Sequence, residues 1–286
     1  MNINCFVAKS GKRFRLKDYD PRYTGGLTKK KAKKKLKALT EEIGEAQNML
    51  FAQKNRGALF IFLGLNGSGK DSVIGHVFTD VHPMGIRAVG FKAPTNRELG
   101  HDYLWREIIE LPERGMFAAF NRSYYEEVTI VRVRPELLEK QNLPPELKDK
   151  NIWKRRFREI SNLEKFLSDN GFVVLKFFIN TSGKERRQRL LERTEIPKKL
   201  CKFSIQDAKE LKYDKALKKS IEATIANTST RENRWYVVPG DNQWFTWYTT
   251  ALIIAKRLRK LGLKYPELTP EKKKEIGKAR KLLKQN

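Results

Sequence analysis

Hydrophobic residues form several short, continuous runs along the chain. The clearest run, Ala58–Leu63 (ALFIFL), contains no polar residue and is followed by a glycine. Such a run is typical of a strand that is buried on both faces of a parallel sheet. Four other apolar segments are predicted as strands: Ile86–Phe91, Met116–Phe120, Phe172–Ile179 and Trp235–Val238.

Segments with helical periodicity separate these strands. Apolar residues at positions 36, 39, 43 and 46 recur at spacings of three and four, which predicts a helix from Thr28 to about Asn55. Further helices are predicted over Lys70–Phe78, Asn96–Ile109, Ile152–Ser168, Lys184–Glu192, Asp207–Ala226 and Trp244–Leu261. Strands that alternate with helices indicate an α/β protein, a three-layer αβα sandwich with a mostly parallel sheet.

The pattern shows no internal repeat and no clean domain boundary. We divide the chain into an N-terminal basic helical extension (1–56), a main domain (57–262) and a basic C-terminal tail (263–286). The Pro-containing stretch Gln141–Glu146 (QNLPPE) is predicted as a surface loop.

Charge adds a class of partner to this picture. The 286 residues include 60 Lys and Arg against 33 Asp and Glu, a formal net charge of +27. Two runs, Lys29–Lys37 and Lys272–Lys284, each hold seven basic residues, which we interpret as solvated helix faces or a frayed tail. The rest of the chain still has 46 basic and 32 acidic residues. This excess predicts a polyanionic partner without saying which one.

Several classes of protein are excluded at this stage. No apolar stretch of about 18 residues exists, so no spanning helix and no membrane association are expected. The N-terminal residues lack the apolar centre of a signal peptide. Two distant cysteines, Cys5 and Cys201, do not make a disulfide framework or a zinc cluster, and they fit a reducing, cytoplasmic location. The three histidines have no metal-ligand spacing.

The strongest local motif follows the first strand. Its sequence GLNGSGKDS satisfies the phosphate-loop pattern G-x-x-x-x-G-K, between a strand and a helix. Its candidate phosphate-binding residues are Gly64, Gly67, Ser68, Gly69, Lys70, Asp71 and Ser72. Glycines let backbone N–H groups turn towards a phosphate, and the helix N-terminus adds its positive dipole. A second Gly-Lys pair, in Ser182-Gly183-Lys184, lacks the first glycine and is predicted as a helix start.

Asp71 occupies the position at which this motif usually carries a hydroxyl group. Its carboxylate can hold Mg²⁺, directly or through water. It can equally be an acid in the first turn of a helix, where it complements the dipole. The residues alone leave both interpretations open.

Together with later motifs, the loop resembles the family 2 polyphosphate kinases over roughly residues 54–261. The motifs are FKAPT (91–95), HDYLWR (101–106), LPERG (111–115), FNRSYYE (120–126), VRV (131–133), LKFF (175–178), KLCKFS (199–204) and WYVVP (235–239). The resemblance implies a P-loop kinase fold with a basic helical lid at about 186–206. It also implies transfer of a phosphoryl group between inorganic polyphosphate and a nucleoside mono- or diphosphate, with Mg²⁺, or Mn²⁺ in its place. It further implies a homo-oligomer, a dimer or a tetramer.

The resemblance also assigns candidate site residues. Lys70, Arg122, Asn66 and Asn121 are the candidate catalytic residues. Further candidates for phosphate or nucleotide binding are Lys92, Arg132, Arg193, Lys198, Lys199 and Lys202. Taken singly, Lys92 and Arg122 also fit solvated strand ends, and the lid residues also fit a basic helix end. Asp102 and Arg106, four residues apart, fit a helix salt bridge, and Trp105, Trp153 and Trp235 fit the core.

Two amides affect the expected metal site. Family members commonly have Asp where this chain has Asn66, and position 121, where the family shows either Asp or Asn, is also Asn here. Because an amide carries no charge, Asp71 and Glu126 are the remaining candidate metal ligands. We hypothesise that Mg²⁺ binds more weakly, or that Asp71 and the phosphates hold it. The lid also has Cys201 where the family has an aromatic residue.

Two alternatives to an active kinase stay open. Asn66 supports a polyphosphate- or nucleotide-binding protein without turnover. The charge of +27 also suits a P-loop protein that binds nucleic acid. Nucleic acid is not the expected partner, because aromatic residues do not interleave with the Lys runs as in a stacking platform. The preferred nucleotide and the direction of transfer are not readable from the residues.

Overall fold

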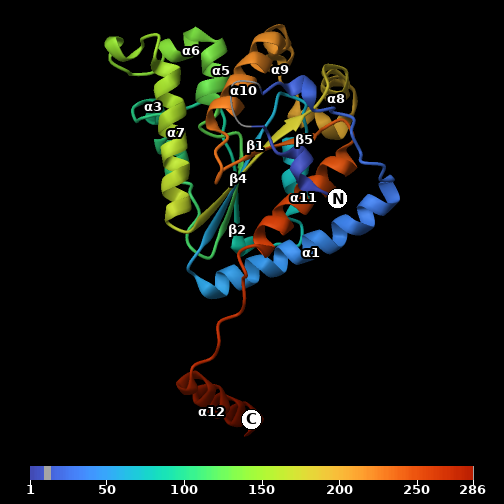
Figure 1. Ribbon diagram of the computed structural model, residues 1–286, viewed down its shortest axis with the longest axis vertical. Coiled ribbons are helices and arrows are strands. Elements are labelled where there is room, and N and C mark those ends of the chain that lie inside the picture. The colour runs from blue at the N-terminus through green and yellow to red at the C-terminus, as the bar shows by residue number, and fades with distance from the viewer. Residues whose placement is uncertain (10–13, 286) are drawn as a thin grey trace.

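The computed structural model describes residues 1–9 and 14–285 (Figure 1). Within them the chain forms one sheet of five strands: β1 Gly57–Leu63, β2 Ile86–Gly90, β3 Phe117–Asn121, β4 Phe172–Asn180 and β5 Trp235–Pro239. The strand order is β2-β3-β1-β4-β5, and every neighbouring pair is parallel. The α/β class, the parallel sheet and the five strands predicted from the apolar runs are therefore confirmed.

Helices connect the strands and cover both faces of the sheet. The α-helices of the described residues are α1 Lys29–Gln53, α2 Lys70–Val77, α3 Asn96–Leu99, α4 Trp105–Ile108, α5 Glu126–Val133, α6 Pro135–Glu139, α7 Ile152–Asp169, α8 Gly183–Glu195, α9 Ile205–Glu210, α10 Asp214–Thr228, α11 Gln243–Arg259 and α12 Pro270–Gln285. Short 3₁₀ helices are η1 Ile3–Phe6, η2 Leu16–Asp18, η3 Pro83–Gly85, η4 Pro145–Leu147, η5 Pro197–Lys202 and η6 Leu211–Tyr213.

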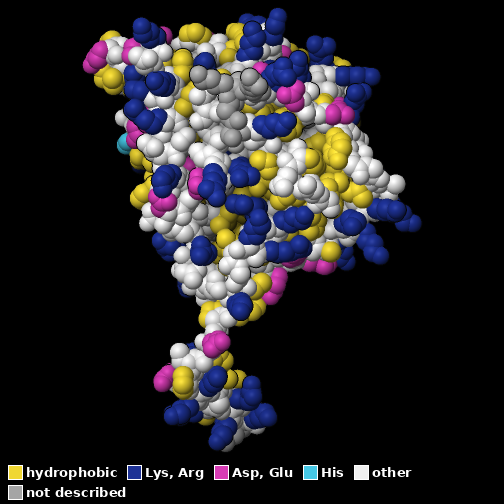
Figure 2. Space-filling model, viewed as in Figure 1, with side chains coloured by type: hydrophobic (Ala, Val, Ile, Leu, Met, Phe, Trp, Pro, Cys, Tyr) yellow, Lys and Arg dark blue, Asp and Glu magenta, His cyan; other side chains and the backbone are white. Residues whose placement is uncertain are grey.

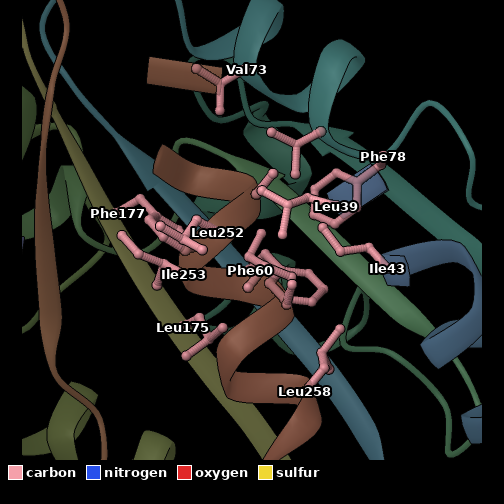
Figure 3. Close-up of a cluster of buried hydrophobic side chains, with 14 of the residues drawn as sticks. Leu39, Ile43, Phe60, Val73, Phe78, Leu175, Phe177, Leu252, Ile253 and Leu258 are labelled. Carbon is pink, nitrogen blue, oxygen red and sulfur yellow. The ribbon is translucent and has the colours of Figure 1, made fainter. Parts of the chain in front are cut away.

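The apolar run of β1 is explained by its central position. All seven of its residues are buried, and successive side chains of a strand point to opposite faces. Phe60 and Phe62 belong to the cluster formed with α1, α2 and α11, part of which is shown in Figure 3. Leu59 and Ile61 belong to a second cluster, which includes residues of α5, α7 and α10. The two clusters are the cores of the predicted three-layer sandwich.

Two predicted helices are interrupted. The segment predicted over 96–109 is two short helices, because α3 ends at Gly100 and Asp102 accepts a hydrogen bond from the backbone of Leu104 instead of continuing the helix. The predicted Asp102–Arg106 pair is also wrong, since Arg106 lies 3.1 Å from Glu107 and 3.8 Å from Glu98. The segment predicted over 207–226 is divided by η6 into α9 and α10.

The two Lys runs lie on exposed helix surface, as predicted. The lysines of 29–37 are all exposed on the first turns of α1, whose apolar side packs along α11. The second run lies on α12, a helix that stands apart from the rest of the molecule in Figure 1 and carries many Lys and Arg side chains in Figure 2. Among the described residues, no helix combines the length and the apolar character needed to cross a bilayer.

Candidate active site

The phosphate loop lies at the carboxyl end of β1, between the carboxyl ends of β3 and β4. Ligands bind at this edge in open α/β sheets, where the strand order changes direction. Gly67 and Gly69 adopt positive φ angles of 80° and 93°, which glycine reaches without steric cost. A Cβ atom on Gly64 would lie 2.6 Å from Ser68 Oγ. The glycines therefore allow the tight turn that carries the chain from β1 into α2.

Lys70 begins α2 and extends back over the loop. Its side chain is buried, and its Nζ donates a hydrogen bond of 2.7 Å to the Gly64 carbonyl. Burial, helped by the nearby positive charge of Arg122 and opposed by Glu126, lowers the pKa of Lys70 to about 8. An anionic ligand at the loop would favour the charged ammonium, because opposite charges close together stabilise the ionised form.

Arg122 comes directly after β3 and reaches the same loop. Its backbone has a positive φ of 68° and donates a hydrogen bond of 3.1 Å to the Phe62 carbonyl of β1. Its guanidinium donates to Asn66 Oδ1 at 3.2 Å and lies 3.9 Å from Glu126. Burial raises the pKa of Glu126, while Arg122 and Lys70 oppose the rise. The strand end therefore places a planar guanidinium beside the loop, in a form suited to paired phosphate oxygens.

Asn121 and Asp71 form a second pair at this edge. The Asn121 amide donates a hydrogen bond to the Asp71 carboxylate, while Asn121 Oδ1 is buried and has no hydrogen-bond partner. An unpaired amide oxygen on a side chain that contacts a carboxylate suits a hard cation such as Mg²⁺, which binds oxygen ligands and keeps several waters. Among the described residues no three acidic, His or Cys side chains group as a metal cage. The protein would therefore supply few of the ligands of a magnesium ion at this site.

The lid follows β4. We use this name for residues 183–213, from α8 to η6, because the helical turns continue past the predicted end near residue 206. Ser182 caps α8 by accepting a hydrogen bond from the backbone of Glu185, which confirms that the second Gly-Lys pair is a helix start. Arg193 pairs with Asp207 at 2.6 Å, and Lys199 pairs with Glu192, so charged contacts hold the lid together.

Two arginines of α8 contact the phosphate loop directly. Arg186 is buried, lies 3.4 Å from the Asn66 carbonyl, and pairs with Asp214 of α10. Arg189 donates to the carbonyls of Gly67 and Ser68, and also to two carbonyls that follow β5, at 2.8 and 3.0 Å. Neither arginine is among the predicted site residues. The sequence feature that could have pointed to them is their spacing of three residues, which places both on the same side of one helix.

A pocket lies between the loop and the lid. Residues 63–66, Arg122 and Glu126 line one side, and Arg186, Asp207, Glu210 and Asp214 line the other. Its empty volume is about 470 Å³, part of it open to solvent. The predicted residues Asn66 and Arg122 thus line one pocket, and Lys70 contacts its edge through the carbonyl of Gly64. Glu210, which the residue pattern does not identify, also reaches it.

Other predicted binding residues lie further out. Lys92, Lys198 and Lys202 are exposed, and Lys92 contributes its backbone carbonyl to Arg106. Ser72 is half-buried in the first turn of α2. The structure does not bring Arg132 into this group, because its guanidinium lies over the ring of Phe157 in α7, 5.8 Å from the centroid.

Comparisons with known proteins agree with this arrangement. The family model described as Polyphosphate kinase 2 matches residues 26–261. An ADP-polyphosphate phosphotransferase of Rhodopseudomonas palustris is 39% identical over 87% of this chain and 86% of its own length. An AMP/ADP-polyphosphate phosphotransferase of Meiothermus ruber is 36% identical over 89% of this chain and 92% of its own length.

A solved structure extends the agreement to the fold. The crystal structure of polyphosphate kinase 2 from Arthrobacter aurescens TC1 superposes with a TM-score of 0.86 at 29% identity, and the match covers 98% of each chain. The fold is therefore that of a P-loop kinase, as the motifs implied. The motif series, the site geometry and these matches together place the chain in the polyphosphate kinase 2 family.

Proposed function

We propose that this protein transfers a phosphoryl group between inorganic polyphosphate and a nucleoside mono- or diphosphate. The observation that carries the proposal is that the phosphate loop, with Lys70 hydrogen-bonded to its Gly64 carbonyl, adjoins a pocket that Asn66 and Arg122 line. Phosphoryl transfer needs positioning and charge neutralisation more than covalent participation by the protein. The family of the chain and the activities of its two named relatives support the same reaction.

The reaction divides the work among these groups. A terminal phosphate oxygen of the nucleotide attacks the end phosphorus of polyphosphate, the bridging P–O bond breaks, and polyphosphate leaves one unit shorter. Lys70 and the loop N–H groups hold phosphate oxygens, and Arg122 neutralises the charge that develops on the transferred group. Lys199 and Arg193 would close the lid over it, and closure excludes water.

Mg²⁺ is part of this proposal. Asp71 and Asn121 would hold it, because the two side chains are in contact and the Asn121 oxygen is without a hydrogen-bond partner. When bound, the ion neutralises phosphate charge and orients the oxygens. Glu126 is a second candidate ligand, since it is the carboxylate beside Arg122 in the lining of the pocket. Mn²⁺ binds similar oxygen ligands and is the expected substitute.

The test is a nucleotide panel with polyphosphate as donor. AMP, ADP, GMP and GDP would each be incubated with the protein and Mg²⁺, and the products separated by chromatography. Lys70→Ala and Arg122→Ala should each abolish transfer while circular dichroism stays unchanged. Arg87→Ala is the matched control, because Arg87 is an exposed arginine of β2 that pairs with Glu110, away from the pocket. Retained activity in both site variants would refute the assignment.

Binding without turnover is the second candidate function. Its specific support is Asn66, the amide in place of the family's carboxylate. Binding of polyphosphate with no nucleotide conversion, in Mg²⁺ and in Mn²⁺, would favour it.

A homo-oligomer, a dimer or a tetramer, is also proposed and is measurable by light scattering. A cytoplasmic location stays a prediction, supported by two cysteines that are both free and exposed.

A further inference from the structure

The side chain of Asn66 lies between two charged groups of opposite sign. Its Oδ1 accepts a hydrogen bond from Arg122, and its Nδ2 donates one to the carboxylate of Glu210 at the end of α9. Arg122 offers only donors and the Glu210 carboxylate offers only acceptors. An amide is therefore the group that satisfies both neighbours, with one end turned to each.

We propose that Glu210 is a positioning residue, a latch that closes the lid onto the phosphate loop, and that the amide at position 66 makes this latch possible. The proposal rests on the proposed function, because it explains how the lid is held over the transferred phosphates. It gives Asn66 a role other than a weakened metal ligand. It also assigns a function to an acidic residue in a lid where basic residues outnumber acidic ones.

The position of Glu210 supports the assignment. Its carboxylate lies 3.9 Å from Arg134, which comes after α5 in the body of the protein. The side chains of Glu210 and Arg134 are mostly buried, at 19% and 22% exposure. One contact therefore joins α9 to the body, and the Asn66 contact joins α9 to the loop. Both contacts are made by Glu210, which lines the pocket.

Other lid contacts do not replace this one. Arg193–Asp207 and Lys199–Glu192 pair residues within the lid. Arg186 and Arg189 reach the loop from α8, near the start of the lid. Among the described residues, Glu210 supplies the side-chain hydrogen bond between residues 196–213 and the phosphate loop. The outer half of the lid therefore depends on it.

A carboxylate at position 66 would act against the latch. It would still accept a hydrogen bond from Arg122, but it would place a second negative charge against Glu210. Glu126 already lies close enough to Glu210 for their charges to interact. Like charges at hydrogen-bond distance repel, and the repulsion is strong in a half-buried site. Asn66→Asp should therefore release α9 from the loop.

The decisive experiment exchanges the amide of Asn66 and the carboxylate of Glu210 between the two positions. Asn66→Asp should lower kcat/KM by roughly tenfold, and Glu210→Gln by about threefold. In the double variant, the glutamine amide can donate to the new carboxylate, which still accepts from Arg122. The pair is then restored with reversed polarity. The double variant should recover to within about threefold of the parent.

Limited trypsin digestion measures how accessible the lid is, independently of the transfer reaction. Lys198 and Lys202 are exposed cleavage sites in the lid. Asn66→Asp should speed cleavage there, and the double variant should slow it again. Glu192→Gln is the matched control, because Glu192 is a lid glutamate that pairs with Lys199 and does not reach the loop. Combined with Asn66→Asp, it should give no recovery.

Two outcomes would overturn the latch. One is an Asn66→Asp variant with equal or higher activity and unchanged cleavage, as expected if position 66 serves the metal. The other is a double variant that is no better than Asn66→Asp alone in both measurements. If the parent protein shows no transfer at all, the proposed function fails, while the cleavage pattern still tests the latch.

Discussion

The phosphate loop and the lid face each other across one pocket but are built differently. The loop continues from a strand whose seven residues are all buried, and its shape depends on backbone angles at glycine. The lid has few buried side chains, and charged pairs such as Arg193–Asp207 hold it together. Buried apolar packing and backbone geometry respond little to salt, whereas ion pairs that solvent partly reaches are weakened by it.

This difference separates the work of the two regions. The loop keeps its shape as part of the sheet, so it can bind phosphate without rearranging. The lid depends on pairs that can exchange partners, and phosphate groups would compete for the same arginines and lysines. A preformed loop and an adjustable lid fit a reaction in which one substrate is a polymer that must shift along after each transfer.

The largest expected effect comes from changing the backbone of the loop. Gly67→Ala forces a side chain into a positive φ, and its Cβ would lie 2.9 Å from the Arg186 carbonyl. We expect a loss of about 1–2 kcal/mol in unfolding free energy and a fall of roughly 100-fold in transfer, because small displacements of reacting groups are costly. Thermal unfolding and initial rates measure the two effects.

Gly75→Ala is the matched control for that change. Gly75 lies in α2, beyond the loop, and a Cβ there meets nothing within 4 Å. Alanine in a helix interior should stabilise the protein by about 0.5–1 kcal/mol and leave transfer near the parent rate. If Gly67→Ala behaves in the same way as Gly75→Ala, the loop does not depend on its backbone angles.

The second prediction concerns the proton of Lys70. Its pKa is lowered to about 8, so the unliganded lysine loses its charge as the pH rises above this value. Tripolyphosphate should bind progressively more weakly above pH 8, by up to about tenfold per pH unit, and binding should take up a proton. Calorimetry in buffers of different ionisation enthalpy measures the uptake. Lys70→Arg keeps its charge and should show no uptake.

The lowered pKa of Lys70 also determines whether the free energy of unfolding rises or falls with pH. Between pH 8 and the ordinary lysine value of 10.5, the unfolded chain holds more protons at Lys70 than the folded protein. The free energy of unfolding should therefore rise with pH in this window, relative to Lys70→Met. A fall with pH, measured by denaturant unfolding, would contradict a lowered pKa.

A smaller effect is expected within the lid. Asp207→Asn removes the partner of Arg193, and pairs of this kind contribute up to about 1 kcal/mol. We expect a loss of about two- to fivefold in kcat/KM at low salt and a smaller difference from the parent at about 0.5 M salt. Steady-state rates at both salt concentrations provide the measurement. An equal loss at both would mean that charge pairing is not what holds the lid.

The smallest effect is expected from removing α12. Its described side chains are exposed, so deletion of residues 266–286 should shift the thermal midpoint by less than about 1 °C. Polyphosphate affinity should fall about twofold to fivefold at low salt and be unchanged at high salt, because seven basic residues are lost. A clear drop in the midpoint would show that α12 stabilises the body.

The layout of the sheet could be predicted because its signals are local. Buried strands appear as apolar runs, and the phosphate loop appears as a fixed spacing between a strand and a helix. Helix α5 is not predicted, because its residues 128–133 (VTIVRV) are rich in β-branched side chains, which favour strands on propensity alone. Packing against α10 and α7 overrides that preference. For the Lys run on α12 the sequence leaves a solvated helix face and a frayed tail both open, because few apolar residues mark the helix.

The contacts of the site could not be predicted in the same way. Asn66 and Glu210 are 144 positions apart, and no spacing rule connects a loop to a lid across such a distance. Arg132 is a predicted binding residue that the structure places away from the site. It lies within a family motif, yet its helix turns it towards Phe157. Which side of a short helix faces the pocket depends on tertiary packing, which the sequence pattern does not contain.

The left-handed backbone of Arg122 has a consequence for the evolution of this position. For a residue other than glycine that conformation costs about 1–2 kcal/mol. Glycine would avoid this cost, but it would leave the pocket without a guanidinium and Glu126 without its charged neighbour. Arginine at this position is therefore a compromise between an unstrained backbone and a charged group at the site.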